Sequence, residues 1–376
     1  MEDLKELRKS IDEIDEQLVA LFEQRMDISS RVADYKIENG KSVFDKEREN
    51  QKLSHLCALG RNDFENTGIR ELFQQLMSMS RKLQYRKLTE HGVLGNLPFI
   101  EVDDIRKDNV RIVYQGVEGA YSQAAVLKYF GKDANMFNCQ TFRDAMNMIA
   151  DGAADYAVLP IENSSAGIVS QNYDMLSEFE NYIVAEVVVK IEHCLLGVKG
   201  AKVEDISTVY SHNQGLMQCS KYLDLHRSMT ACEMENTAMA AKKVAEEGDI
   251  TQAAIASRNS AELYGLDILE DNIATSGNNY TRFIVVTNQR VFVKGAGKIS
   301  VSFELPHESG SLYRLMSHFI YNGLNMTDIE SRPVPGRTFE YRFFVDFEGN
   351  LNESAVKNAL RGIREEALNL KILGNY

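Results

Sequence analysis

A long uninterrupted amphipathic pattern near the N-terminus limits most strongly what this chain can fold into. Apolar residues recur at the inner positions of a heptad from Leu4 to Tyr35, and the pattern is broken once, by Arg25. No glycine or proline interrupts it before Gly40. We expect one helix of roughly 50 Å, since each helical residue adds about 1.5 Å. An apolar seam of that length needs a partner of similar length, and a second copy of the chain is the simplest one.

Two further helices are predicted before residue 90. One begins after Asp45, a residue type typical of an N-cap. The other runs from about residue 68 to residue 89, and its apolar face continues into Ser80 and Gln84. Any one of the inward polar residues, taken alone, is better explained as a tolerated polar core residue. Several together indicate a site, because each buried unpaired polar group costs roughly 1–3 kcal/mol.

The three stretches LRKSIDEIDEQLVALFEQRMDISSRVADYK, VFDKERE and LFQQLMSMSRKLQ closely resemble the all-helical chorismate mutase family. The resemblance implies a pericyclic rearrangement of chorismate to prephenate, in which arginines position the substrate carboxylates. The catalytic residues Lys36 and Gln84 would donate hydrogen bonds to the ether oxygen as negative charge builds there. Asp45 and Glu49 would bind the ring hydroxyl. Matched residue by residue, the family's site comprises Arg8, Arg25, Lys36, Asp45, Arg48, Glu49, Ser80 and Gln84.

The spacing of two of these arginines has a geometric consequence. Arg8 and Arg25 are 17 residues apart, which is roughly 25 Å along one helix. One small molecule cannot contact both side chains on the same helix. We therefore expect Arg8 to enter the site of a partner chain. The predicted active site is then complete only in a dimer.

Residues 91–109 form a predicted linker. The sequence allows a short helix within it and does not decide whether one forms. From residue 110 to residue 290, β-rich runs alternate with helical ones, which is typical of an α/β domain with mostly parallel sheets. VRIVY, DYAVLP, TVYSH and AAIAS are predicted strands, and each leads into a polar loop. Because ligands bind at the carboxyl ends of strands in such sheets, four loops of this kind predict a cleft for a small anion.

Taken together, these loops resemble the prephenate dehydratase family. GVEGAYS, PIENSSAG, SHNQ, NTAMAAKKVAE and NYTRF stand in the family's order, with Asn213 for a usual proline and Gly215 for a common alanine. The resemblance implies two α/β lobes around a cleft, as in periplasmic binding proteins, and loss of carbon dioxide and water from prephenate to give phenylpyruvate. Thr281 is the catalytic residue expected to protonate the departing hydroxyl, and Glu162 is the alternative acid. The residues implied in substrate binding are Ser122, Asn163, Ser164, Ser211, Gln214, Thr281 and Arg282.

The C-terminal region has a predicted strand–helix–strand–strand–helix–strand order, which is ferredoxin-like and α+β. Its elements are expected at 298–305, 311–322, 326–333, 339–347, 354–366 and 370–373. HESGSLYRLM and the intact ESRP motif resemble the amino-acid-binding ACT domain, which implies phenylalanine binding and feedback inhibition. The implied effector-binding residues are Gly310, Ser311, Leu312, Glu330, Ser331, Arg332 and Pro333.

Composition excludes several classes of protein. A net charge of −13 argues against a nucleic-acid partner, since no basic stripe is present to neutralise phosphates. No apolar run reaches the length of a membrane span, and the charged N-terminus is unlike a signal peptide. The five scattered cysteines show no metal-ligand spacing and suggest buried thiols in a reducing compartment. We expect a cytoplasmic enzyme without metal or cofactor.

The three resemblances together predict a multidomain bifunctional enzyme of phenylalanine synthesis. Its expected parts are an all-α mutase domain at 1–90, the linker at 91–109, the dehydratase domain at 110–290 and the ACT domain at 297–376. Its expected ligands are chorismate, prephenate and phenylalanine, and its expected state is a homodimer or a higher oligomer. A fusion with prephenate dehydrogenase is disfavoured because no GxGxxG occurs. The alternative from another class is a non-catalytic phenylalanine sensor, against which the retained Arg25, Lys36, Gln84, Thr281 and Glu162 speak.

Overall fold

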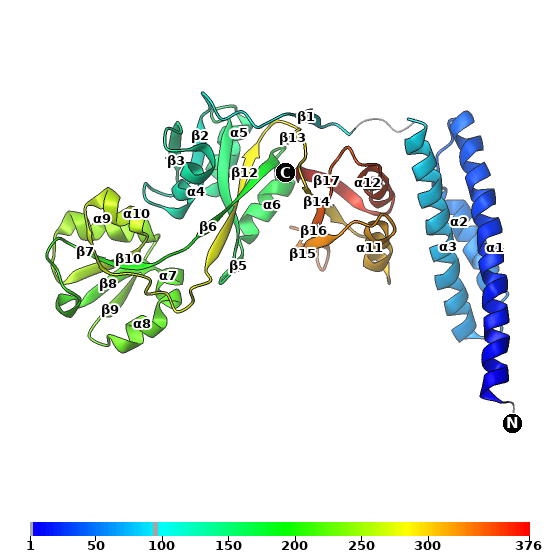
Figure 1. Ribbon diagram of the computed structural model, residues 1–376, viewed down its shortest axis with the longest axis horizontal. Helices are drawn as coiled ribbons and strands as arrows, with labels where there is room; N and C mark the ends of the chain where they lie inside the picture. The colour runs from blue at the N-terminus through cyan, green and yellow to red at the C-terminus, as the bar shows by residue number, and fades with distance from the viewer. Residues whose placement is uncertain (1–2, 93–96) are drawn as a thin grey trace. The chain divides into compact units, whose positions relative to one another are not determined.

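The computed structural model describes residues 3–92 and 97–376, and Figure 1 labels their helices and strands. Its residues group into two compact units. One unit comprises Met1–Leu97 with Ser302–Leu370, and the other comprises Pro98–Val301 with Lys371–Tyr376. The N-terminal helices and most of the C-terminal region therefore share a unit.

The N-terminal region is helical, as its periodicity predicts. α1 (Leu4–Glu38) begins after the N-cap Asp3, and α2 (Lys46–Cys57) begins after Asp45, whose carboxylate accepts from the backbone N–H of Arg48 at 3.0 Å. α3 (Asp63–Glu90) begins five residues before the predicted start. The side chain of Asn62 accepts from the backbone N–H of Glu65 at 2.9 Å, and this cap extends the helix past Gly68 toward the N-terminus.

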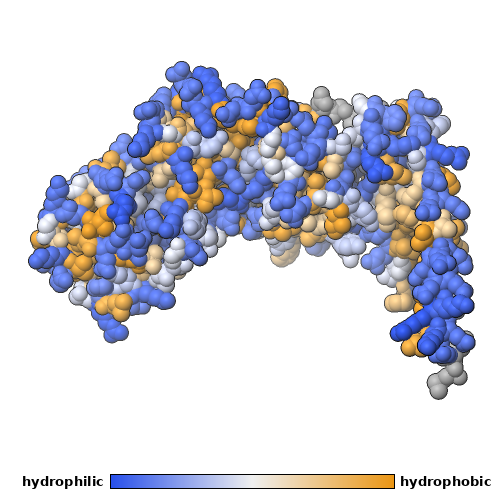
Figure 2. Space-filling model, viewed as in Figure 1, coloured by the Kyte–Doolittle hydropathy of each residue, from blue (hydrophilic) through white to orange (hydrophobic). Residues whose placement is uncertain are grey.

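The apolar seam of α1 is exposed along its length. Ala33 is the buried residue of this helix, whereas Ile11, Leu18 and Ile28 are 57%, 52% and 58% exposed. Apolar side chains are visible among the hydrophilic ones on the N-terminal helices in Figure 2. Within the described residues of a single chain, the long helix thus leaves much of its apolar stripe uncovered.

The α/β region forms two lobes. In the first lobe the strand order is β3-β2-β4-β12-β6, and β5 pairs with β4; in the second it is β11-β7-β10-β8-β9. The first lobe's elements are β2 (Ile112–Gln115), α4 (Tyr121–Phe130), β3 (Met136–Cys139), α5 (Phe142–Ala150), β4 (Tyr156–Asn163), β5 (Gly167–Ile168), α6 (Ser170–Glu178), β6 (Tyr182–Lys190) and β12 (Tyr280–Thr287). Those of the second are β7 (Cys194–Gly197), η1 (Val203–Asp205), β8 (Thr208–His212), α7 (Asn213–Gln218), α8 (Ser220–Leu225), β9 (Thr230–Met234), α9 (Thr237–Glu247), β10 (Gln252–Ala256), α10 (Arg258–Tyr264) and β11 (Asp267–Glu270).

The sheets are mixed, and the expectation of mostly parallel sheets is wrong. β2 pairs in parallel with β3 and β4, but β12 runs antiparallel to both β4 and β6. In the second lobe β8 pairs in parallel with β9 and β10, but β7 runs antiparallel to β10 and β11. The chain leaves the first lobe after β6 and returns through β12, and a returning strand beside its outgoing neighbour is antiparallel to it.

The predicted linker contains a strand, whereas the sequence allows a short helix there. β1 (Ile100–Val102) pairs in parallel with β13 (Val291–Val293), with Glu101 opposite Phe292. The remainder of the predicted linker includes residues 93–96, which lie outside the described residues.

The C-terminal region follows the predicted element order. Its strands lie in the order β15-β16-β14-β17, which is the ferredoxin-like arrangement. β16 begins two residues later than predicted, because Phe339 has a φ of 60° and belongs to the preceding turn. The elements are β14 (Lys298–Glu304), α11 (Ser311–Tyr321), β15 (Met326–Pro333), β16 (Tyr341–Glu348), α12 (Ser354–Glu366) and β17 (Leu368–Asn375).

Three further features concern the described residues as a whole. No helix among them has the length and the apolar character that crossing a membrane requires. Nor do they contain a group of His, Cys, Asp and Glu side chains able to hold a metal ion. All five cysteines are free thiols, and Cys232 is half-buried, so the expectation that every thiol is buried is wrong at that position.

Candidate active sites

An open hollow of about 870 Å³ lies among the N-terminal helices. The structure brings together around it all but one of the residues predicted for the mutase site. These are Arg25, Lys36, Asp45, Arg48, Glu49, Ser80 and Gln84. The predicted residue that does not line the hollow is Arg8, which is exposed near the start of α1.

Arg25 and Ser80 form the inner wall of this hollow. Arg25 Nη1 donates to the carbonyl oxygen of Leu76 at 2.7 Å and to Ser80 Oγ. Ser80 Oγ also lies 3.1 Å from Ser29 Oγ, to which it is hydrogen-bonded. Partial burial lowers the pKa of Arg25, and the nearby carboxylate of Glu49 works in the opposite direction. Ser80 therefore orients an arginine that α1 supplies from its seam.

Lys36 and Gln84 present polar groups to the same hollow. Lys36 Nζ donates to the carbonyl oxygen of Val43 at 2.6 Å, which holds the ammonium at the end of α1. Burial lowers the pKa of Lys36, and Asp45 and Glu49 oppose this effect. Gln84 is buried, and its Oε1 has no hydrogen-bond partner among the described residues. A hollow lined by both an unpaired buried amide oxygen and an ammonium suits a ligand that carries both donors and acceptors.

Arg81 is a residue of this site that the sequence analysis missed. It is 8% exposed, its Nη1 pairs with the Glu49 carboxylate, and its guanidinium lies 4.9 Å from the centroid of the Phe44 ring. A signal was present, because Arg81 follows Met77 by four residues and precedes Gln84 by three. It therefore lies in the inward stripe of α3.

In the α/β region, Asn163 and Thr281 form the centre of the second candidate site. They are paired across the antiparallel strands β4 and β12. Asn163 Nδ2 donates to Thr281 Oγ1 at 2.8 Å, and Asn163 Oδ1 accepts from the backbone N–H groups of Ser165 and Ala166. Because two backbone donors contact Oδ1, the orientation of the amide is determined. Thr281 Oγ1 is therefore an acceptor in this contact, and its own proton is available to another partner.

Ser164 holds the loop that follows β4 in place through hydrogen bonds. Its backbone N–H donates to the carbonyl oxygen of Tyr280 at 2.8 Å, and its Oγ accepts from the backbone N–H of Tyr280 at 2.9 Å. The same Oγ donates to the carbonyl oxygen of Asn278 at 3.1 Å. Ser164 thus connects the turn after β4 with the segment that leads into β12, and so supports the Asn163–Thr281 pair.

A chain of hydrogen bonds runs from this pair into the second lobe, through residues that received no role from the sequence. Asn163 Nδ2 also donates to Asn279 Oδ1 at 2.8 Å, and Asn279 Nδ2 donates to Gln218 Oε1 at 2.9 Å. His193 Nε2 lies 2.8 Å from the same Gln218 oxygen. A carbonyl oxygen only accepts, so His193 Nε2 carries the proton. The spacing of Gln218 and His193 in the sequence offers no signal of this contact.

Glu162 and Arg282 lie on the other face of the β4–β12 pair. Each is the immediate neighbour of a member of the Asn163–Thr281 pair, and they are paired with each other across the strands. Successive residues of a strand point to opposite faces. Arg282 Nη2 lies 3.1 Å from Glu162 Oε2, and Arg282 also contacts Glu186. The structure therefore does not bring these two side chains together with Thr281.

The other predicted dehydratase residues lie at the ends of neighbouring elements. Ser122 is buried in the first turn of α4, and Gln214 is exposed in α7. Ser211 is fully buried, and its Oγ donates to the carbonyl oxygen of Ile255 at 2.7 Å. A Cβ at Gly215 would lie 2.5 Å from Ser211 Oγ, which explains why this chain has glycine there. None of the described hydrogen bonds joins these residues to Thr281.

Two of the predicted effector residues line a smaller hollow of about 340 Å³ in the C-terminal region. Ser311 and Leu312 line it, and Gly310 immediately before them adopts a φ of 76°. The ESRP motif lies on β15, where Pro333 is paired with Tyr341, a further lining residue. The structure therefore brings the two motifs to the same end of this sheet.

Comparisons with known proteins identify the family to which this chain belongs. The family model for chorismate mutase type II matches residues 7–85, and the model for prephenate dehydratase matches residues 112–291. A bifunctional chorismate mutase/prephenate dehydratase of Pseudomonas aeruginosa is 34% identical over 99% of this chain and 97% of its own length. This chain belongs to the bifunctional chorismate mutase/prephenate dehydratase family. It is therefore an enzyme with two domains of distinct activity.

Two solved structures add a likeness of fold. A prephenate dehydratase of Arthrobacter aurescens, solved in complex with L-Phe, has 30% identity and a TM-score of 0.66 over 71% of this chain and 89% of its own. A quorum quenching acylase is 30% identical with a TM-score of 0.65, covering 70% of this chain and 96% of its own. The mutase match spans α1 to α3, and the dehydratase match spans both lobes.

Proposed function

We propose that this enzyme rearranges chorismate to prephenate in the hollow lined by Arg25, Lys36 and Gln84, and converts prephenate to phenylpyruvate at Thr281. The observation that carries the proposal is the Asn163–Thr281 hydrogen bond, because it leaves a threonine proton free beside strands that match the dehydratase family. Neither reaction requires a metal or a cofactor in this scheme.

The mutase step depends on positioning. Chorismate carries two carboxylates, and Arg25 and Arg48 supply guanidinium groups at the wall of the hollow. As the ether bond breaks, its oxygen gains negative charge, and Lys36 and Gln84 stabilise that charge by hydrogen bonding. Gln84 donates as a neutral amide, so its contribution requires no change in its protonation state.

The dehydratase step is a decarboxylation coupled to loss of hydroxide. The bond from the ring to its carboxylate breaks, carbon dioxide leaves, and the electron pair forms the new ring double bond as the hydroxyl departs. Thr281 donates its free proton in a hydrogen bond to the departing oxygen, which leaves as water after taking up a proton from solvent. We prefer Thr281 to Glu162 in this role, because Glu162 lies on the opposite face of the sheet and pairs with Arg282.

We further propose that the mutase works as a dimer in which Arg8 completes the partner's site. Support comes from the exposed apolar seam of α1 and from the distance between Arg8 and the hollow. Mixing chains carrying Arg8→Ala with chains carrying Arg25→Ala tests this directly. Random pairing of the two variants gives one intact site in four, so about a quarter of the wild-type mutase activity should return. Activity no higher than that of either variant alone would contradict the shared site.

We propose phenylalanine as the ligand of the C-terminal hollow and as a feedback inhibitor. The relative from Arthrobacter aurescens was solved in complex with L-Phe. Here Ser311 and Leu312 line the hollow, and Pro333 of the ESRP motif is paired with the lining residue Tyr341. Calorimetric titration should show phenylalanine binding in the wild type and much weaker binding in Leu312→Asp, which adds charge at an apolar wall. We also place the enzyme in the cytoplasm, a proposal that its five free thiols support.

One experiment tests the whole scheme. The purified chain is given chorismate without added metal or cofactor, and prephenate and phenylpyruvate are followed with and without phenylalanine. Phenylpyruvate formation that phenylalanine suppresses is the expected result. Prephenate that accumulates without phenylpyruvate would contradict the dehydratase assignment and leave only the mutase.

A further inference from the structure

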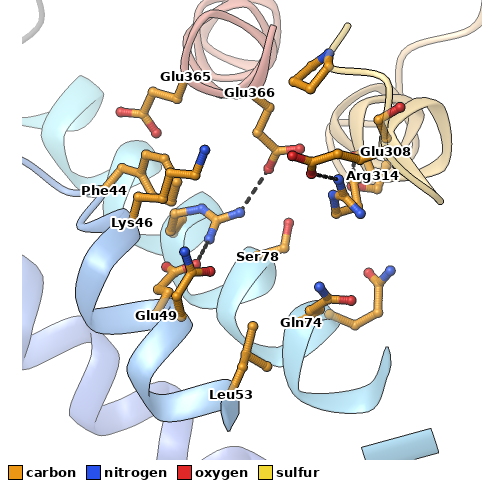
Figure 3. Close-up of a pocket in the computed structure, with 16 residues that line it drawn as sticks. Phe44, Lys46, Glu49, Leu53, Gln74, Ser78, Glu308, Arg314, Glu365 and Glu366 are labelled. Carbon is orange, nitrogen blue, oxygen red and sulfur yellow. Dashed lines mark hydrogen bonds and ion pairs between the residues drawn. The ribbon is translucent and has the colours of Figure 1, made fainter. Parts of the chain in front are cut away.

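Two carboxylates from distant parts of the chain converge on Arg81. Nη1 of Arg81 pairs with Glu49 of the mutase hollow, and Nη2 lies 2.8 Å from Oε1 of Glu366, the last residue of α12. In Figure 3 one dashed line leads from the labelled Glu49 and another from the labelled Glu366 to the same guanidinium, which these two ion pairs identify as that of Arg81. Glu366 Oε1 also lies 3.2 Å from Nε2 of the buried His318.

We propose that Arg81 is a positioning residue of the mutase reaction, and that Glu366 of the C-terminal domain holds Arg81 in place. This inference deepens the proposed function and rests on it. Glu49 is one of the residues proposed to bind the ring hydroxyl of chorismate. Arg81 also lines the hollow, but its two terminal nitrogens are engaged by Glu49 and Glu366, so we assign it a role that acts through Glu49.

The charges explain why such a residue is needed. Chorismate is a dianion, and an uncompensated Glu49 carboxylate in the same hollow would repel it. Arg81 compensates that charge at short range, and the Glu49 and Glu366 carboxylates raise the pKa of Arg81 in spite of its burial. Its side chain is 9% exposed, so solvent screens the contact with Glu49 little.

The planar guanidinium also fixes the direction of the contact. Arg81 uses different terminal nitrogens for the two carboxylates, and the Phe44 ring lies 4.9 Å from the guanidinium. Three neighbours therefore define the plane and the rotation of one group. Because Glu366 supplies one of these restraints on the Arg81–Glu49 contact, the geometry of the mutase site depends on the position of α12.

Other contacts between α3 and the C-terminal helices provide the matched control. Thr89 Oγ1 donates to Asn358 Oδ1 of α12 at 2.7 Å, two turns beyond Arg81. This contact joins the same two helices without involving Arg81 or Glu49. Thr89→Val therefore weakens the packing of α12 on α3 without changing the charges at the mutase hollow.

The test measures mutase and dehydratase kinetics in the full-length chain. Arg81→Met should raise the mutase KM for chorismate about tenfold and change kcat much less, because Glu49 binds a group that is present in both the ground state and the transition state. Glu366→Gln should raise the KM about threefold, and Thr89→Val should not change it. Arg81→Lys should recover part of the loss, since a lysine supplies the charge without the two-sided contact.

The double variant decides whether the two residues act together. If Glu366 acts through Arg81, Glu366→Gln should have no further effect on the KM in the Arg81→Met background. Equal effects of Glu366→Gln and Thr89→Val would overturn the proposal, as would additive effects of Arg81→Met and Glu366→Gln. An unchanged KM in Arg81→Met would also overturn it. Dehydratase kinetics report on the integrity of the fold in every variant. A wild-type chain that fails to rearrange chorismate would overturn the proposed function itself.

Discussion

Asn163 donates a hydrogen bond from Nδ2 to Thr281 Oγ1 over 2.8 Å, and the backbone N–H groups of Ser165 and Ala166 prevent the amide from flipping. The direction of this bond matters more than its length. Thr281 receives a proton from Asn163 and keeps its own, so its hydroxyl can donate to a departing oxygen in the cleft.

Removal of the threonine hydroxyl should therefore abolish one activity and preserve the other. Thr281→Val keeps the shape of the side chain, and we expect it to lower the dehydratase kcat at least about a hundredfold, the scale seen when one charge-stabilising donor is removed. Thr281→Ser retains the hydroxyl and is the matched control, for which we expect most of the activity to remain. The assay follows phenylpyruvate from prephenate, together with mutase activity on chorismate. A Thr281→Val enzyme as active as Thr281→Ser would remove Thr281 from the mechanism.

The contact between the lobes gives a second prediction. Gln218 Oε1 accepts from Asn279 and from His193, so Gln218→Leu leaves two donors without their partner. We expect the dehydratase kcat to fall about tenfold, because each lost bond of this kind is worth roughly 1 kcal/mol and the Asn279 side chain would no longer be fixed beside Asn163. Stopped assays of phenylpyruvate formation measure this effect. Met217→Ala, at the exposed neighbouring position of α7, should have no comparable effect.

The positions of the site residues show where prediction from the sequence stops. The motifs located Thr281, Asn163 and Glu162 near one another, but they did not say which side chains share a face. That depends on the register of β4 against β12, in which Thr281 lies opposite Asn163 and Arg282 opposite Glu162. A shift by one residue would exchange the two faces. Register is set by contacts distant in the sequence, so the local motifs do not contain it.

Helices were predicted more accurately than strand register, because helical periodicity is a local property of the sequence. The pattern from Leu4 to Tyr35 predicted a helix that the structure has at Leu4–Glu38, and the hollow contains Arg25 from that helix. The inward stripe of α3 likewise includes Arg81, but its partner Glu366 lies 285 residues further along the chain. A charged residue in an inward stripe indicates that some partner exists, and only the tertiary structure identifies it.

A third prediction concerns pH and His193. Burial lowers the pKa of this histidine below its ordinary value of 6.5, although the bond to Gln218 opposes the shift. The unfolded chain then binds a proton more readily than the folded one, so the free energy of unfolding should fall as the pH is lowered through 6.5. His193→Gln keeps a side-chain N–H donor and has no such titration. Urea unfolding at pH 7.5 and pH 5.5 should show a larger loss of stability in the wild type than in this variant. Equal losses would mean that His193 does not titrate differently in the two states.

The last prediction concerns the protonation state of the mutase donor. Gln84 is an amide, so the hydrogen bond that it donates to the substrate does not depend on pH, whereas a carboxyl group donates only when protonated. In Gln84→Glu the mutase kcat should therefore be highest at acidic pH and should fall as the pH rises through the pKa of the new carboxyl group. The unperturbed pKa of a glutamate is about 4.3, and burial at this position raises it. Gln84→Ala removes the donor and should be slow at every pH. Profiles of mutase kcat between pH 4.5 and 8 separate these cases, after correction for the wild-type profile. A Gln84→Glu enzyme whose profile parallels the wild type would show that Gln84 does not donate to the breaking ether bond.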